Sequence, residues 1–385
     1  MHAIAFKAGP RLATRLVFFI AGFATATWAV IVPFAKANTG VNEATLGTLL
    51  LCLGMGALIA MPLTGMLTTR YGCRRVITVA LAIVTPATPL LAGISDTALL
   101  ATVLLLFGIG VGVTDCAMNI QAIIVERQAR TPLMSGFHGM YSVGGIAGAG
   151  FMTLMLTLGA SVLIASLAAA AIVALLLVLS LEGLLPWANP ATGQGFAVPR
   201  GIVLLIGIVC YAVFLAEGTV LDWSAVFLTE VRGMPETMGG LGFTAFAVAM
   251  TVARLTGDRL IAWLGALPMV FGGAVVAAGG FALVTFVPAW SLTLLGYVLV
   301  GAGCANIVPV MFSAVGRQTL MPQAAAVPAI TTMGYLGVLA GPAMVGYIAH
   351  GSSLSNAFIF ITILMLAVAG LSLAIHPGRK AVPRS

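Results

Sequence analysis

TALLATVLLLFGIGVGVTDCAMNIQAIIV, residues 97–125, is an apolar stretch long enough to cross a lipid bilayer, for which about 20 helical residues suffice. Asp115 and Asn119 lie deep inside it, and their spacing places both on one helix face. A charged carboxylate at the bilayer centre costs about 3 kcal/mol on insertion scales, so such residues usually face a water-filled cavity and mark a transport path. The alternative is a neutral Asp115 that is hydrogen-bonded to a neighbouring helix and serves packing alone.

The composition of the whole chain agrees with this stretch. Of 385 residues, 61% are hydrophobic and 7% are charged, and the mean hydropathy is +1.15. A soluble domain cannot bury so much apolar surface, so we predict an all-α membrane protein. The five cysteines form no metal-ligand spacing and are too scattered for a disulfide framework. The sequence also lacks a nucleotide-binding loop or nucleophile motif, so it predicts no enzyme and no bound cofactor or metal.

Twelve apolar stretches of spanning length lie between charged or Pro- and Gly-rich breaks. The longest break, GLLPWANPATGQGFAVPR, contains three prolines and separates six stretches from six. We therefore predict an N-terminal six-helix bundle over residues 1–182, a cytoplasmic central loop over 183–200 and a C-terminal six-helix bundle over 201–385. The predicted spans are residues 15–36, 43–68, 76–95, 97–125, 133–157, 160–182, 201–228, 237–257, 266–287, 290–315, 326–349 and 354–375.

Lysine and arginine are distributed unequally between the two sides that these spans define. Fifteen of the 17 share a side with the N-terminus, and only Lys36 and Arg232 fall on the other. Because loops rich in Lys and Arg stay in the cytoplasm, we predict that both termini are cytoplasmic. Topology thereby accounts for the net charge of +7, and we expect no nucleic-acid partner. The fifteen are Lys7, Arg11, Arg15, Arg70, Arg74, Arg75, Arg127, Arg130, Arg200, Arg254, Arg259, Arg317, Arg379, Lys380 and Arg384.

The two halves of the chain resemble each other in sequence. An offset of 193 residues relates Glu43 to Glu236 at the start of spans two and eight, and the same offset relates Gly72 to Gly265 after those spans. In span four the stretch GVGVTD, residues 110–115, aligns with GAGCAN in span ten, which ends at Asn306. Parallel repeats of this kind place a substrate site near the midplane between the halves, where rocking exposes it alternately to each side.

The segment after span two contains a short sequence motif of glycines and basic residues. Residues 65–75 read GMLTTRYGCRR, which resembles the loop signature of the major facilitator superfamily, a glycine followed by Asp-Arg-x-Gly and a basic cluster. Thr69 replaces the family's acid and Cys73 a basic residue, whereas Asp258 and Arg259 look like the intact counterpart after span eight. The resemblance implies two pseudo-symmetric six-helix bundles whose cytoplasmic ends this acid helps to latch, although topology alone also explains the arginines. The implied cytoplasmic gate consists of Arg70, Arg74, Glu126, Arg127, Arg254, Asp258 and Arg259.

Four further stretches resemble a narrower group, the uncharacterised bacterial inner-membrane transporters that are distantly similar to the fucose permease. They are TDCAMNIQAIIVER in span four, GFHGMYSVGGIAGAG in span five, AEGTVLDWSAVFL in span seven and TTMGYLGVLAGPAMVGY in span eleven. This resemblance implies an acid in span four and an acid in span seven, which Asp115 and Glu217 provide. It also implies a monomer in the bacterial inner membrane that binds a small-molecule substrate.

Polar side chains can be placed by depth at about 1.5 Å per helical residue. Asn119 and His138 then lie at a similar depth, roughly 10 Å from the cytoplasmic ends of spans four and five, where they could touch. Asp115 lies deeper, near Tyr141. His138 has an alternative role as a packing residue, and Trp28 is either an interfacial anchor or a ring that stacks on a sugar. The predicted substrate-binding residues are Trp28, Asp115, Asn119, His138, Tyr141, Glu217, Asn306 and Thr332.

We predict a secondary active transporter that moves a small polar solute, a sugar or related metabolite, by proton-coupled symport across the bacterial inner membrane. Asp115 and Glu217, the latter past the midplane of span seven, are the predicted proton-coupling residues. Efflux of drugs or metabolites is the first alternative, although span five has Gly148-Ala149 where drug antiporters have glycine and proline. A ligand sensor that does not transport is the second, and we expect an additional soluble domain in such a protein.

Overall fold

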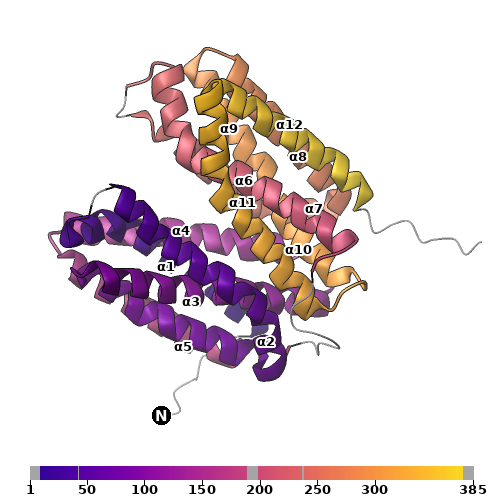
Figure 1. Ribbon diagram of the computed structural model, residues 1–385. Helices are drawn as coiled ribbons and strands as arrows, with labels where there is room; N and C mark the ends of the chain where they lie inside the picture. The colour runs from indigo at the N-terminus through magenta and orange to yellow at the C-terminus, as the bar shows by residue number, and fades with distance from the viewer. Residues whose placement is uncertain (1–8, 42, 189–197, 236–237, 376–385) are drawn as a thin grey trace, which may run out of the picture. The chain divides into compact units, whose positions relative to one another are not determined.

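A computed structural model describes residues 9–41, 43–188, 198–235 and 238–375 of the chain. These residues are helical almost throughout, and no strand occurs among them (Figure 1). The predicted all-α class is therefore confirmed. Much of the predicted central loop lies outside the described residues, as do Lys7, Glu236, Arg379, Lys380 and Arg384.

Contacts between residues divide the chain into two compact units. The first unit consists of Met1–Arg130, Phe137–Ala197 and Pro322–Ala329, and the second consists of Thr131–Gly136, Val198–Met321 and Ile330–Ser385. Each unit thus includes a short segment from the opposite half of the sequence. The division after Ala197 falls inside the predicted central loop, and the domain boundaries stay a prediction.

Helices of the first unit pack closely through glycine. α2 lies along α3, and α1 lies against α2, α3 and α5 (Figure 1). Gly22 of α1 faces the carbonyl oxygen of Tyr141 in α4, and Gly144 of α4 faces that of Phe19 in α1, so a side chain at either glycine would collide with backbone. The helices of this unit are α1 (Pro10–Thr39), α2 (Glu43–Gly93), α3 (Thr97–Ala129), α4 (Met134–Thr157), whose first three residues belong to the second unit, and α5 (Val162–Ser180), followed by a short 3-10 helix, η1 (Leu181–Gly183).

α2 is interrupted at Gly72, whose φ of 80° and ψ of 159° are not helical. A positive φ strains residues that have a Cβ, and a Cβ at this position would also meet the carbonyl of Pro186. The interruption falls between predicted spans two and three, residues 43–68 and 76–95. α2 therefore contains both predicted spans.

In the second unit, α6 lies against α7, α10 and α12, while α8 lies against α9 and α12. Ala305 and Asn306 separate α9 from α10, where the sequence predicts one span over residues 290–315. Helix α6 continues into a π-helical turn, η2. The helices of this unit are α6 (Ile202–Val226), η2 (Phe227–Val231), α7 (Leu241–Leu264), α8 (Ala266–Phe286), α9 (Trp290–Cys304), α10 (Ile307–Arg317), α11 (Gln323–Gly351), whose residues up to Ala329 belong to the first unit, and α12 (Leu354–Ala374).

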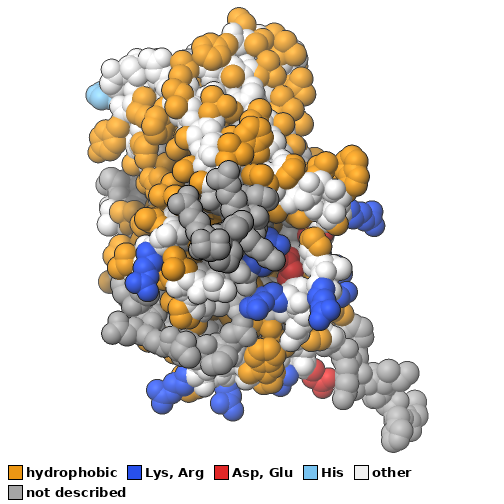
Figure 2. All heavy atoms as spheres, turned by 90° about the vertical axis from the view of Figure 1, so that its right-hand side faces the viewer, with side chains coloured by type: hydrophobic (Ala, Val, Ile, Leu, Met, Phe, Trp, Pro, Cys, Tyr) orange, Lys and Arg blue, Asp and Glu red, His pale blue; other side chains and the backbone are white. Residues whose placement is uncertain are grey.

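Ten helical segments in the described part of the chain are long and apolar enough to cross a membrane. In this set α2 is a single segment, despite the break at Gly72, and α7 is not included. α7 carries Arg254, Asp258 and Arg259. Counting α2 twice and adding α7 would give twelve spans, so the count of twelve stays a prediction. Large hydrophobic side chains are exposed on both units, for example Val79 at 61% and Val252 at 58%, and Figure 2 shows such side chains over wide areas of one face. Exposed apolar surface of this extent suits contact with lipid.

Candidate functional site

Asp115 and Asn119 lie one turn apart on α3, as the sequence predicts. Asp115 is half-buried, and no residue in the described ranges donates a hydrogen bond to its carboxylate or forms an ion pair with it. Asn119 is 1% exposed, and its Nδ2 donates to the backbone oxygen of Asp115 at 2.9 Å. Asn119 therefore bonds within its own helix and not to His138, although their similar predicted depths would allow the two side chains to touch. Among the described residues, no cation compensates the charge of the Asp115 carboxylate.

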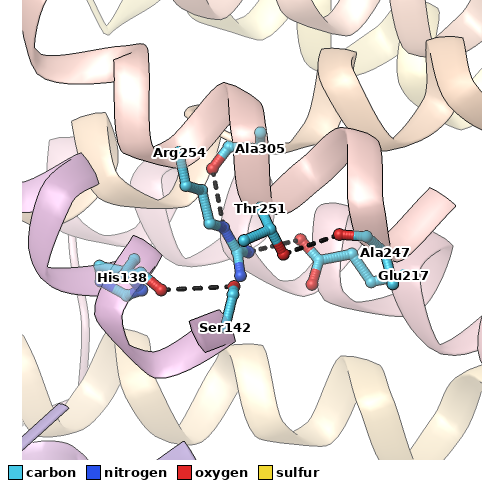
Figure 3. A network of polar contacts seen from close by, with 7 residues as sticks. All are labelled: His138, Ser142, Glu217, Ala247, Thr251, Arg254 and Ala305. Carbon is cyan, nitrogen blue, oxygen red and sulfur yellow. Dashed lines mark hydrogen bonds and ion pairs between the residues drawn. The ribbon is translucent and has the colours of Figure 1, made fainter. Parts of the chain in front are cut away.

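His138 and Tyr141 lie on α4 and are both half-buried. The His138 ring meets the Phe18 ring edge-on, with centroids 5.2 Å apart. One turn along α4, the Ser142 hydroxyl donates to the backbone oxygen of His138 at 3.4 Å (Figure 3). The Phe18 contact agrees with the packing role considered for His138, and substrate contact by His138 or Tyr141 stays a prediction.

Trp28 is 5% exposed on α1, and its ring packs against Phe107 of α3 at 6.4 Å between centroids. An interfacial anchor exposes part of its indole to the headgroup region. The burial of Trp28 inside the first unit therefore disfavours the anchoring role that the sequence left open.

Glu217 of α6 and Arg254 of α7 form a buried ion pair in the second unit (Figure 3). Nη2 of Arg254 lies 3.4 Å from Oε1 of Glu217, and the two side chains are 8% and 16% exposed, respectively. Nε of Arg254 donates to the backbone oxygen of Ala305 at 3.1 Å. The sequence predicts Glu217 for proton coupling and Arg254 for the gate, but it does not predict that the two side chains pair. The available signal was that both residues are ionisable and lie in apolar spans, where such residues tend to pair.

Asn306 lies between α9 and α10 and is 4% exposed. Its Nδ2 donates to the backbone oxygen of Ala253 in α7 at 3.1 Å, and its Oδ1 lies against Gly257 without a hydrogen-bond partner among the described residues. Asn306 thus ties two helices together, whereas Asp115, its counterpart in the repeat, makes no such tie. Thr332 is half-buried on α11, and its role in substrate binding stays a prediction.

Residues predicted for the cytoplasmic gate make contacts of different kinds. The carboxylate of Asp258 accepts hydrogen bonds from the backbone N–H groups of Ser135 at 3.0 Å and Gly136 at 2.9 Å, at the start of α4. Those N–H groups have no partner inside the helix, and a negative charge is favourable there. Arg74 instead binds the segment that follows α5, through the backbone oxygens of Leu184 and Glu182.

The remaining gate residues lie at or near the surface, and the existence of the gate stays a prediction. Arg70 is exposed and lies over the ring of Tyr71, 5.2 Å from its centroid. Glu126 is half-buried near the end of α3. The exposed members are Arg70, Arg127 and Arg259.

A sequence model described as Major Facilitator Superfamily matches residues 16–327, which is most of the chain. The chain belongs to the major facilitator superfamily. An uncharacterised MFS-type transporter of Yersinia pestis is 48% identical over 366 residues, which cover 95% of this chain and 95% of that protein. The predicted resemblance to the superfamily is thus confirmed, and the family and fold are those of membrane transporters.

Solved structures of the superfamily share the fold at low sequence identity. The Escherichia coli fucose:proton symporter has a TM-score of 0.78 at 15% identity, covering 95% of this chain and 98% of that one. The human organic anion transporter MFSD10 has a TM-score of 0.75 at 17% identity, covering 94% and 98%. Because the two proteins are named for different solutes, likeness to them shows the fold and does not select a substrate.

Proposed function

We propose that this superfamily transporter moves a small polar solute, a sugar or related metabolite, together with protons across the bacterial inner membrane, with both termini in the cytoplasm. The observation that carries the proposal is the Asp115 carboxylate, which is half-buried in α3 and has no cation beside it among the described residues. The fold of a fucose:proton symporter and the hydroxyl, imidazole and amide groups of α3 and α4 support a hydroxylated solute.

Asp115 and Glu217 differ in how their charge is compensated. An isolated carboxylate at membrane depth is costly while it is charged, and binding a proton removes that cost. Proton binding at Asp115 would therefore ease passage of the loaded carrier through a closed state. The charge of Glu217 is already balanced by Arg254, so proton exchange at Glu217 requires the ion pair to separate. We infer that Asp115 is the first proton-binding residue and that Glu217 has a secondary role.

The first step of the test identifies a ligand. Thermal stabilisation of the purified protein is measured with sugars, sugar acids, nucleosides, amino acids and lipophilic cations at pH 5.5 and pH 7.5, because a ligand that binds the folded state raises its apparent stability. A hydroxylated solute whose effect changes with pH supports the proposal. Stabilisation by lipophilic cations alone would contradict it and favour efflux.

The second step measures transport in proteoliposomes under an imposed pH gradient. We expect the wild type to accumulate the identified solute, and Asp115→Asn to lose accumulation while it still exchanges labelled for unlabelled solute. Asp222→Asn is the matched control because Asp222 is an exposed carboxylate of α6, and it should keep both activities. Accumulation that survives in both Asp115→Asn and Glu217→Gln would exclude these acids as coupling residues.

A further inference from the structure

A pocket of about 460 Å³ lies in the first unit, between the second part of α2 and η1. The pocket lies just after the break in α2 at Gly72, on the predicted cytoplasmic side, because Arg74 and Arg75 are among the cations that set the predicted topology. The lining residues are Arg74, Arg75, Thr78, Val79, Leu181 and Glu182. Asp115 is not among the lining residues, and Arg74 is the one lining residue that also belongs to the predicted cytoplasmic gate.

The wall formed by η1 is held in place by hydrogen bonds. Nε of Arg74 donates to the backbone oxygen of Leu184 at 2.9 Å, and Nη2 of Arg74 donates to the backbone oxygen of Glu182 at 2.9 Å. The backbone N–H of Arg74 donates to the backbone oxygen of Leu185 at 2.8 Å. The side-chain oxygen of Gln121 accepts from the backbone N–H of Leu185 at 3.1 Å. The pocket is therefore a preformed feature, built from elements more than 100 residues apart in sequence.

The charge of the pocket is unevenly compensated. Arg75 is exposed and makes neither a hydrogen bond nor an ion pair with any residue that the structure describes. Arg74 uses its guanidinium on two carbonyl oxygens, which are neutral and leave its charge uncompensated. Glu182 is the one acid among the lining residues and is exposed. The lining of the pocket itself is almost wholly apolar. Two guanidinium groups against one carboxylate therefore leave a net positive charge at the rim of the pocket, with free N–H donors at the exposed Arg75.

The surface beside the pocket is apolar on both helices that flank it. Val79 of α2, which also lines the pocket, is 61% exposed, and Val178 and Leu175 of α5 are 62% and 59% exposed. In a membrane protein, exposed aliphatic side chains of this kind contact acyl chains. A ligand of this pocket can therefore place a charged group at the arginines and a hydrocarbon chain along α2 and α5.

We propose that this pocket binds the phosphodiester headgroup of an anionic phospholipid. A guanidinium presents a planar fork of donors that fits phosphate oxygens, and basic pockets between helices on the cytoplasmic side suit anionic headgroups. The apolar flank distinguishes a lipid from a soluble phosphate, which would gain nothing from Val79 and Val178. The excess of arginine over acid distinguishes an anionic lipid from a zwitterionic one.

Native mass spectrometry of the purified full chain tests the proposal with phosphatidylglycerol, phosphatidylcholine and phosphatidylethanolamine that carry the same acyl chains. We expect the wild type to retain phosphatidylglycerol preferentially. Arg75→Gln should lower its occupancy about fivefold, the ratio that corresponds to about 1 kcal/mol for one basic residue near the membrane surface. Arg75→Lys should keep most of the preference. Arg15→Gln, which removes an exposed arginine of α1 in the same unit, should keep all of it.

Four results would overturn the proposal. Equal retention of phosphatidylglycerol and phosphatidylcholine, or equal losses in Arg75→Gln and Arg15→Gln, would show that Arg75 selects no anionic headgroup. Preferential retention of phosphatidylethanolamine would show that Glu182 recognises an amine and that the net charge of the headgroup does not determine which lipid is bound. Displacement of phosphatidylglycerol by an equal concentration of glycerol phosphate would assign the pocket to a soluble anion. Size-exclusion profiles of every variant establish that each is folded.

Discussion

Arg254 holds Glu217 across the α6 and α7 interface, with 3.4 Å between Nη2 and Oε1 and at most 16% of either side chain exposed. This separation exceeds the 2.7–2.9 Å that is typical of charge-assisted hydrogen bonds. The ion pair is therefore longer than usual, and it lies in a largely buried environment where an unpaired charge is costly. Such a pair adds little net stability, but the loss of one partner leaves an uncompensated buried charge.

We therefore predict that Glu217→Gln and Arg254→Gln each lower the free energy of unfolding by about 3–5 kcal/mol. The double variant, Glu217→Gln with Arg254→Gln, should be closer to the wild type than either single variant, because no buried charge then remains. Thermal or denaturant unfolding of the purified protein measures both effects, and the double-mutant cycle gives their coupling.

Glu230→Gln is the control for this pair because Glu230 is an exposed acid of the same unit, and its effect should stay within about 0.5 kcal/mol. Additive effects of the two single substitutions would show that Glu217 and Arg254 do not interact.

A second prediction concerns the close approach of α1 and α4. A Cβ at Gly144 would collide with the carbonyl oxygen of Phe19, whereas a Cβ at Gly150, two turns along α4, would have nothing within 4 Å. Gly144→Ala should therefore destabilise the protein by about 1–3 kcal/mol, the range for overpacking. Gly150→Ala should leave stability unchanged or raise it slightly, because alanine favours the helix. Equal unfolding temperatures for the two variants would contradict the predicted helix contact.

The course of the helices could largely be predicted from the sequence, because long apolar stretches and their end signals are local properties. The stretch that begins at Thr97 shows this, since Asp96 caps α3 by accepting a hydrogen bond from the backbone N–H of Leu99 at 2.7 Å. The break between α9 and α10 could not be predicted in the same way. There Asn306 bonds to the backbone of Ala253, a residue 53 positions away, and apolar periodicity carries no information about such a partner.

The candidate site shows the same limit. Asp115 and Glu217 could be chosen from the sequence because ionisable residues are rare at membrane depth. The different environments of these two acids could not be predicted, because the presence of a cation beside each carboxylate depends on how the neighbouring helices are rotated. Arg254 is 37 residues from Glu217 and reaches it only through the packing of α6 against α7.

A third prediction concerns Gln121, which joins α3 to two other segments. Its Nε2 donates to the hydroxyl of Thr14 at 3.0 Å, and its Oε1 accepts from the backbone N–H of Leu185 at 3.1 Å. Gln121→Ala leaves the buried N–H of Leu185 without this acceptor, at a cost of about 1–3 kcal/mol, whereas the Thr14 hydroxyl keeps its bond to the backbone oxygen of Pro10. Hydrogen exchange at the Leu185 amide should become about tenfold faster or more. Gln128→Ala, at an exposed position of the same helix, should leave that exchange rate unchanged, and an equal rate in both variants would contradict the prediction.

A fourth prediction concerns Arg232, one of the two cations on the predicted outer side. Its Nη2 donates to the backbone oxygens of Val284 at 2.6 Å and Thr285 at 2.8 Å, near the end of α8. Its Nε donates to the Thr293 hydroxyl at 3.3 Å, and its guanidinium lies 4.9 Å from the centroid of the Phe227 ring. The last carbonyls of a helix have no partner within it, and a cation is favourable there. Arg232 therefore connects η2, α8 and α9.

Replacing Arg232 by alanine should lower the free energy of unfolding by about 2–4 kcal/mol, since several hydrogen bonds and a cation–π contact are lost together. Arg232→Lys should recover only part of this loss, because one ammonium nitrogen cannot replace both Nη2 at the two carbonyls and Nε at Thr293, and it lacks the planar group that lies over the Phe227 ring. Arg317→Ala, at an exposed arginine of the same unit, serves as the control in the same unfolding measurement. Full recovery by lysine would mean that charge alone, and not the geometry of the guanidinium, stabilises this end of α8.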